Sequence, residues 1–238
     1  TGFNDIFVAI AGILLLVGGG WLGGEVHPAL GGAIVAALSW GLSEYFTRQR
    51  RMALPSIVFL LSFVGSVFST LVSATIADGA VEAGDSASAA ILAACAGLAA
   101  AAAWVHWRRF QVPITIAAGT AACVGLCLSL FLATVGTESM DRLVYGLLLV
   151  LGLAVFAYAM RWDMSDPMRT SRRSDVAFWL HLLAAPMIAH STFALLGILN
   201  GEPGTAKALV VVLLYVAMGL VALAVDRRAL LVSALGYV

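Results

Sequence analysis

The chain has 238 residues, of which 62% are hydrophobic and only 11% are charged, and its mean hydropathy is +1.01. A soluble domain usually carries about 25% charged and about 45–50% apolar residues, so this composition excludes a soluble enzyme, a disordered segment, a secreted disulfide scaffold and a nucleic-acid-binding module. Thirteen basic and thirteen acidic residues give a net charge of zero, which provides no global field for an acidic partner. The sequence predicts a polytopic membrane protein.

Apolar runs of membrane-spanning length follow one another along the chain. A helix needs about 20 mostly apolar residues to cross the hydrocarbon core of roughly 30 Å. This rule predicts a single all-α transmembrane domain over residues 1–238 with eight spans, at about 3–22, 29–46, 53–77, 87–105, 112–135, 143–160, 176–199 and 208–225. A ninth apolar stretch, 229–238, is too short to cross, so we expect a partial helix or one that continues past Val238.

Basic residues are divided unequally between the two sets of alternate loops. Eleven of the thirteen lie in one set, and only Arg142 and Lys207 lie in the other. Because cytoplasmic loops carry the excess of Lys and Arg, this division predicts a cytoplasmic N-terminus. The preference for Arg over Lys, with abundant Ala and Gly, is typical of a bacterial coding sequence, so we expect a multi-pass protein of the bacterial inner membrane.

Arginine pairs recur close to predicted helices that leave the cytoplasm: Arg50-Arg51, Arg108-Arg109, Arg172-Arg173 and Arg227-Arg228. An ungapped alignment from Arg51 and Arg173 matches Ser69-Thr70 with Ser191-Thr192. One interpretation is a helical hairpin repeated in parallel about an axis along the membrane normal, as in some transporters. The other is that cytoplasmic helix ends attract arginine and that apolar helices match by chance.

The seventh predicted span carries an unusual polar group. Two histidines, His181 and His190, lie on either side of Pro186, and Ser191 and Thr192 follow. Nine residues at about 100° each place the histidines on opposite faces of a straight helix, and a proline should kink it. One interpretation is a substrate site with His190 as the hydrogen-bonding group beside the two hydroxyls. The other is neutral histidines that bond to neighbouring helices.

The third predicted span carries hydroxyl residues four positions apart. Ser62, Ser66 and Thr70 lie on one row of this helix. Small and hydroxyl residues at this spacing let helices approach closely and bond across the contact, but the same row is able to line a hydrated pathway. For a substrate site, we expect Ser66 and Thr70 to face the histidines of the seventh span.

No cofactor is expected from the sequence. It contains no phosphate-binding Walker loop, no HExxH, no GxSxG, no CxxC pair and no lysine deep in a late helix. No Asp, Glu, Lys or Arg lies near the centre of a span. An enzyme with a recognisable site is therefore not expected. Haem ligated by His181 or His190 is kept as an alternative, in which only His106 offers His181 a partner at a plausible depth.

Two cytoplasmic features carry charge. We expect Glu44 to pair with Arg48 one turn along its helix, with a gating carboxylate as the alternative. The loop 161–175 should turn at Asp166-Pro167, and Ser174 or Asp175 should cap the helix that follows.

Arginines of the same loop offer a contact surface. Arg169, Arg172 and Arg173 provide contacts for anionic lipid headgroups or for a protein partner.

These features together favour a permease or channel-like transporter of a small solute. The many spans, the short loops and the polar seventh helix support this hypothesis. The alternative is a non-catalytic accessory subunit of a larger membrane complex, favoured by the shortage of buried charge. Membrane lipids are expected partners in both cases, with other membrane subunits or further copies of the chain beside them.

Overall fold

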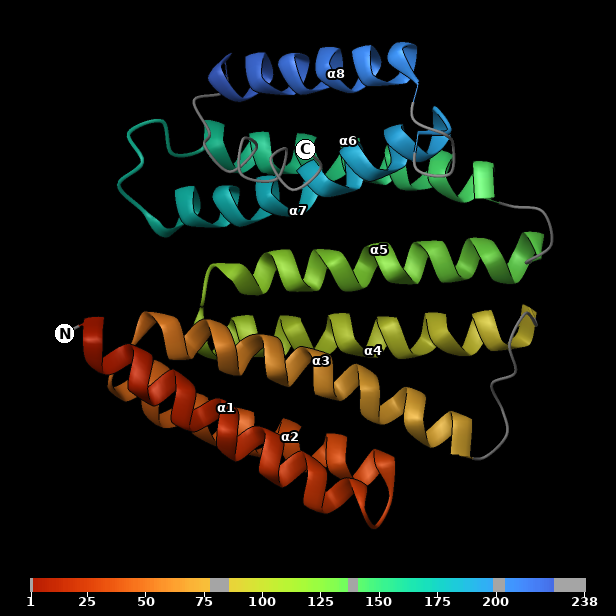
Figure 1. Ribbon diagram of the computed structural model, residues 1–238. Helices are drawn as coiled ribbons and strands as arrows, with labels where there is room; N and C mark the ends of the chain where they lie inside the picture. The colour runs from red at the N-terminus through yellow and green to blue at the C-terminus, as the bar shows by residue number, and fades with distance from the viewer. Residues whose placement is uncertain (1, 78–85, 137–140, 199–203, 225–238) are drawn as a thin grey trace. The chain divides into compact units, whose positions relative to one another are not determined.

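The computed structural model describes residues 2–77, 86–136, 141–198 and 204–224, and every regular element in these ranges is a helix (Figure 1). Seven of the helices are long and apolar enough to cross a membrane. This agrees with a multi-pass helical membrane protein, and it confirms the predicted fold class at that level.

The helices are α1 (Gly2–Gly24), α2 (Pro28–Leu42), the π-helix η1 (Ser43–Gln49), α3 (Ala53–Ala77), α4 (Ser86–Phe110), α5 (Ile114–Val135), α6 (Asp141–Met164), α7 (Arg172–Leu195) and α8 (Thr205–Ala224). The first seven predicted spans each coincide with a long helix. The predicted span at 208–225 coincides with α8, whose apolar stretch Ala208–Ala217 is shorter than a span, so its crossing stays a prediction. The stretch 229–238 lies outside the described residues.

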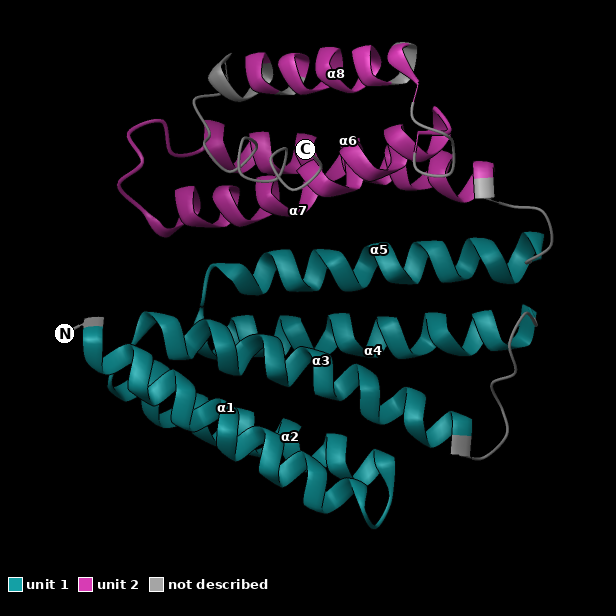
Figure 2. Ribbon diagram, viewed as in Figure 1, with its two compact units in different colours: residues 1–138 teal, residues 139–238 magenta. Residues whose placement is uncertain are grey.

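Two compact units divide the chain (Figure 2). The first comprises Thr1–Glu138 and holds α1 to α5, and the second comprises Ser139–Val238 and holds α6 to α8. Each unit is described here by itself, and the prediction of one transmembrane domain stays a prediction.

In the first unit, α3 is the central helix, because it contacts α1, α2, α4 and α5. Its Phe59 and Leu60 are fully buried. Small residues bring the neighbouring helices close to one another. A Cβ atom at Gly31 of α2 would lie 2.5 Å from the carbonyl oxygen of Gly20 in α1, so only glycine permits this approach.

In the second unit, α6 and α7 pack against each other. In the most apolar 18-residue stretch of α7, 56% of the residues are buried, the largest share among the seven candidate spans. The helix continues through Pro186. At Gly152 of α6, an added Cβ atom would lie 3.0 Å from the side chain of Ile188 and 3.2 Å from that of Met187. The two helices are therefore in close contact just after the proline.

The arginine pairs do not share one position in the fold. Arg50 and Arg51 follow η1, with Arg51 at a positive φ of 53°, whereas Arg108 and Arg109 lie in the last turn of α4. Arg172-Arg173 begins α7. Arg50-Arg51 and Arg108-Arg109 nevertheless precede α3 and α5 in the chain, and the hairpin repeat stays a prediction. The pair at 227–228 lies outside the described residues.

Candidate functional site

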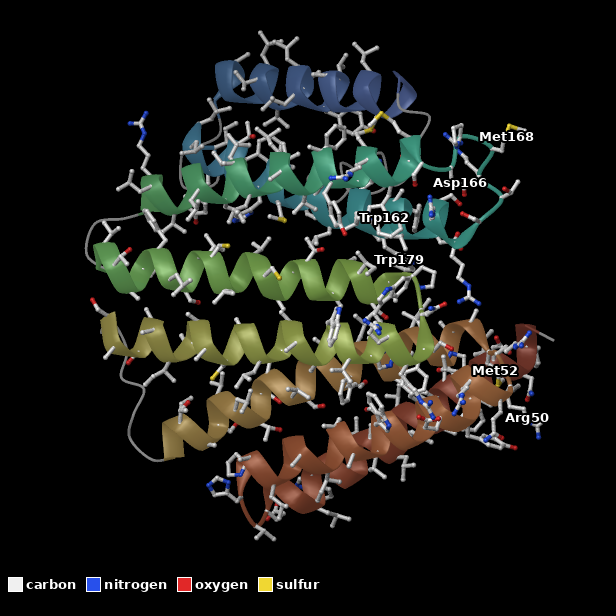
Figure 3. All side chains as sticks on the ribbon, turned by 180° about the vertical axis from the view of Figure 1, so that it is seen from behind. Arg50, Met52, Trp162, Asp166, Met168 and Trp179 are labelled. Atoms are coloured by element: carbon white, nitrogen blue, oxygen red, sulfur yellow. The ribbon has the colours of Figure 1, made fainter. Side chains whose placement is uncertain are left out.

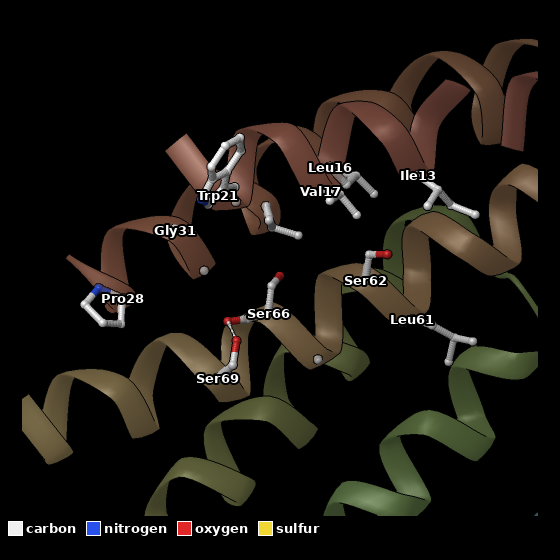
Figure 4. A pocket seen from close by; sticks show the side chains of 14 residues that line it. Ile13, Leu16, Val17, Trp21, Pro28, Gly31, Leu61, Ser62, Ser66 and Ser69 are labelled. Atoms are coloured by element: carbon white, nitrogen blue, oxygen red, sulfur yellow. Dashed lines mark hydrogen bonds between the residues drawn. The ribbon is translucent and has the colours of Figure 1, made fainter. Parts of the chain in front are cut away.

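A cavity of about 460 Å³ lies between α1, α2 and α3 (Figure 4). Its wall on α1 is apolar and includes Leu16, Val17 and Trp21, and its wall on α3 carries the hydroxyl groups of three serines, Ser62, Ser66 and Ser69. None of the residues that line it carries a charge. Binding sites for small molecules typically combine a largely apolar lining with a few polar groups, and this cavity has that character.

The serines on α3 have defined hydrogen bonds. Ser66 is only 7% exposed, and its hydroxyl donates to the carbonyl of Phe63 at 3.0 Å. The Ser69 hydroxyl donates to the carbonyl of Ser66 at 3.1 Å, and Thr70 donates to the same carbonyl at 2.6 Å. Thr70 lies directly against Gly32 of α2. The predicted row therefore divides: Ser62 and Ser66 line the cavity, while Thr70 packs a helix contact.

A second cavity of about 380 Å³ lies on another side of α3, against α4 and α5. Its lining is apolar, with alanine as its commonest residue and Ser129 as the polar exception. Leu61 and Gly65 of α3 line both cavities. Sequence analysis did not find this space, because alanine-rich helices are as compatible with tight packing as with a gap.

The two hydroxyl groups predicted on α7 bond to their own helix. Ser191 is fully buried, and its hydroxyl donates to the carbonyl of Met187 at 2.6 Å. The hydroxyl of Thr192 donates to the carbonyl of Ile188 at 2.7 Å. Hydroxyl groups in helices often bond back in this way. Both hydroxyl protons are therefore bound within α7, and the part of these residues in a substrate site stays a prediction.

Both histidines of α7 meet α6. The ring of His190 lies 5.8 Å from that of Tyr145, and the ring of His181 lies 5.2 Å from that of Phe156, as measured between centroids. The expectation that they lie on opposite faces of a straight helix stays a prediction, because side chains on either flank of α7 are able to reach α6. Pro186 lies between them, and a proline interrupts regular helical periodicity.

The buried ring of His181 contacts a carboxylate of α6. Its Nε2 atom hydrogen-bonds with Oδ2 of Asp163 at 2.9 Å, and the two side chains are 0% and 13% exposed. A histidine that holds a carboxylate at one nitrogen has a fixed ring orientation. Haem ligation through that Nε2 atom would first require this bond to break.

His106 of α4 lies in a box of aromatic rings. Its ring centroid is 4.5 Å from that of Phe110, 5.7 Å from Phe63 and 6.0 Å from Trp40. The side chain is fully buried, and neither ring nitrogen has a hydrogen-bond partner among the described residues. His106 belongs to the first unit and His181 to the second, so no haem pair is described within either unit.

Glu44 binds two arginines. The predicted pair with Arg48 is confirmed at 3.3 Å. Sequence analysis missed the closer partner, Arg109 of α4, whose Nε and Nη2 atoms donate to the two carboxylate oxygens at 2.7 and 3.1 Å. A bidentate arginine pair is a stronger link than a single contact. Glu44 therefore joins η1 to the end of α4.

The segment between α6 and α7 is organised by Asp166 (Figure 3). Its carboxylate accepts bonds from the backbone N–H of Thr170 at 3.3 Å and from the N–H and hydroxyl of Ser171 at 2.9 and 2.8 Å. These bonds, led by the Ser171 hydroxyl, lower the pKa of Asp166. The predicted turn is confirmed by the bond from the Arg169 N–H to the Asp166 carbonyl at 3.0 Å.

The cap of α7 differs from the prediction. Ser171 is the N-cap, and its hydroxyl accepts from the N–H of Arg173 at 3.2 Å. Ser174 and Asp175 lie inside the first turn instead. The helix begins earlier because Asp166 holds Ser171 in place. Arg169, Arg172 and Arg173 are all exposed, and their contact with lipid headgroups or a partner stays a prediction.

Within the described ranges, no group of three or more His, Cys, Asp and Glu side chains is arranged to hold a metal ion. No protein-family model matches this chain, and neither a curated protein nor a solved structure matches it. The candidate site therefore depends on its own geometry, and the cavity between α1, α2 and α3 is the one that combines volume with polar groups.

Proposed function

We propose that this chain is a membrane permease that binds a small uncharged solute in the cavity between α1, α2 and α3. The observation that carries the proposal is the lining of that cavity: an apolar wall on α1 faces serine hydroxyls on α3, without a charged residue. A charged solute would find no oppositely charged side chain among the residues that line this cavity. An uncharged molecule with at least one polar group suits these walls.

The finer membrane arrangement is part of the proposal. We place the chain in a bacterial inner membrane with its N-terminus in the cytoplasm, α8 as an eighth span and residues 229–238 as part of a ninth. The distribution of the arginines supports this orientation. Cysteine labelling from either side of the membrane tests it: residues next to Arg50 should react from the cytoplasmic side only.

The proposed binding site is tested with a photoreactive alcohol. A diazirine derivative of octanol, added to the protein in lipid nanodiscs, should label peptides of α1 and α3 in a saturable way, and unlabelled octanol should compete. Ser66→Leu, which replaces a lining hydroxyl group with a larger apolar side chain, should abolish this labelling, whereas Ser129→Leu should not. Labelling that rises without saturation and spreads over all exposed helices would contradict the proposal.

The competing site on α7 is tested in the same assay. If His190, with Ser191 and Thr192, binds the solute, His190→Ala will remove the saturable labelling and Ser66→Leu will leave it intact. Our proposal expects the reverse. The contacts of Ser191 and Thr192 with their own helix support that expectation.

The accessory-subunit proposal has one supporting observation. One helix, α1, exposes many large apolar side chains, among them Phe3 at 75%, Trp21 at 70% and Leu22 at 70%. Lipid or the helices of another subunit would cover them. Native mass spectrometry of the gently extracted protein separates the two proposals: a permease should run as this chain alone or as copies of itself with a retained small molecule, and an accessory subunit should run with other chains.

A further inference from the structure

The two cavities of the first unit meet along one row of α3. Leu61 and Gly65 line both of them, and Phe68 of the same row lines the second. Leu61 is 46% exposed and Phe68 is 37% exposed, so these side chains form a ridge between the two spaces. In Figure 4 the side chain of Leu61 points away from α1, while Ser62 and Ser66 lie on the side of α3 that faces α1.

Gly65 interrupts this ridge. A Cβ atom added there would meet nothing within 4 Å, whereas one at Gly32 would collide with Thr70. Glycine in a membrane helix usually marks a close helix contact, and Gly65 has no such contact. Its missing side chain leaves a low point between Leu61 and Phe68, where a flexible chain is able to cross from one cavity to the other.

The cavities differ in chemistry. The first carries Ser62, Ser66 and Ser69, and alanines of α4 and α5 are the commonest residues in the lining of the second. A molecule that occupies both would therefore keep its polar end in the first cavity and its apolar chain in the second.

The hydrogen bonds of the serines specify the polar end. The hydroxyl protons of Ser66 and Ser69 are already donated to carbonyls of α3. A hydroxyl group has one proton to donate and two lone pairs that accept, so both serines offer acceptors to a ligand. The matching polar group is a hydrogen-bond donor, such as an alcohol.

We infer that the chain binds a long-chain alcohol, with its hydroxyl group at Ser66 and Ser69 and its chain crossing α3 at Gly65 into the cavity beside α4 and α5. This inference rests on the proposed function, which it narrows from an uncharged solute to one class of amphiphile. It also distinguishes a free alcohol from the acyl chain of a membrane lipid, which brings no donor to the serines.

The test compares diazirine derivatives of octanol and hexadecanol in nanodiscs. Ala122→Leu narrows the second cavity, and Gly65→Leu blocks the crossing in a position with free space around it. Each variant should weaken saturable labelling by the hexadecanol probe about tenfold, because each buried CH₂ group contributes several-fold to affinity. Labelling by the octanol probe in Ala122→Leu should stay within about twofold of the wild type, since that probe fits the first cavity.

Two controls complete the design. Gly18→Leu adds the same side chain to α1 at another glycine with free space that lines neither cavity, and both probes should label it as they label the wild type. The methyl ether of hexadecanol lacks the donor and should compete about three- to tenfold less well than the alcohol. Thermal unfolding shows whether each variant folds. If either Ala122→Leu or Gly65→Leu fails to fold, the other still tests the inference.

Two outcomes would overturn the inference. If Ser66→Leu abolishes labelling by both probes while Ala122→Leu and Gly65→Leu change neither, the proposed function stands and the two-cavity ligand does not. If none of the three variants changes the labelling, both are wrong. Equal competition by the alcohol and its ether would remove the assignment of the polar group.

Discussion

Helices α3 and α7 carry similar side chains in different surroundings. Each has an adjacent serine and threonine in its second half, and in both pairs the threonine hydroxyl donates to the carbonyl four residues earlier. In the most apolar 18-residue stretch of each helix, 22% of the residues are buried in α3 and 56% are buried in α7. Ser66 of α3 lines a cavity, whereas Ser191 of α7 is fully buried.

Similar polar side chains in apolar helices thus differ in whether a ligand is able to reach them. A hydroxyl group or a histidine is available to a ligand only where the packing leaves a volume next to it. The histidines of α7 contact side chains of α6, namely Asp163, Phe156 and Tyr145. The serines Ser62, Ser66 and Ser69 of α3 line the cavity beside α1 and α2. Four predictions test this contrast.

The largest effect is expected at His181. His181→Ala should destabilise the second unit by about 3–5 kcal/mol, because it empties a fully buried volume and leaves Asp163 without this partner. Thermal unfolding in detergent measures it. His190→Ala is the matched control at a half-buried position and should cost only about 1 kcal/mol. Equal losses in the two variants would mean that α7 is not packed as described.

The next effect concerns the contact between α2 and α3. Gly32→Ala should destabilise the first unit by about 1–3 kcal/mol, because the added methyl group collides with Thr70. The control is Gly18→Ala, where the added methyl group meets nothing within 4 Å. If Gly32→Ala unfolds at the same temperature as the wild type, Thr70 is not a packing residue and belongs with the cavity serines.

Gly65→Ala should act in the opposite direction. Its methyl group enters free space, and alanine favours a helix over glycine by up to about 1 kcal/mol. The variant should therefore unfold at a slightly higher temperature than the wild type. A clear loss of stability would show that a neighbouring side chain occupies the low point of the α3 ridge.

The smallest effect is a local response to pH at Asp166. Its bonds from Ser171 and Thr170 hold its pKa below the ordinary value, so they stabilise the segment fully above about pH 4. That stabilisation is lost as the pH falls through the lowered pKa. Amide exchange of Ser171, corrected for its intrinsic rate, should speed up below pH 4 in the wild type. In Asp166→Ala it should already be fast at neutral pH.

The apolar runs predicted the positions of the seven long apolar helices well, because each crossing needs about 20 apolar residues. The ends were less predictable. Polar side chains with tertiary partners extend α4 to Phe110, where Arg109 binds Glu44, and Asp166 begins α7 at Arg172 by fixing Ser171. Hydrogen bonds of this kind do not follow helical periodicity, so the apolar pattern does not predict them.

The candidate site was predictable only in part. The four-residue spacing identified Ser62 and Ser66, which line the cavity. It also selected Thr70, which packs against Gly32. The spacing identifies residues that share one face of a helix, but not what lies against that face. The aromatic box around His106 depends on Trp40 and Phe63 from two other helices, and no pattern within α4 indicates it.

The π-helix η1 has a consequence for chain length. Its hydrogen bonds run from a residue to the fifth one before it, as from the Arg50 N–H to the Tyr45 carbonyl at 3.0 Å, so each turn encloses one more residue than an α-helical turn does. Removing a single residue between Tyr45 and Gln49 would let this segment relax into an α-helix without shortening any apolar run. Homologous chains that differ in length by one residue should therefore have their gap here, after Glu44, where its bond to Arg109 would survive.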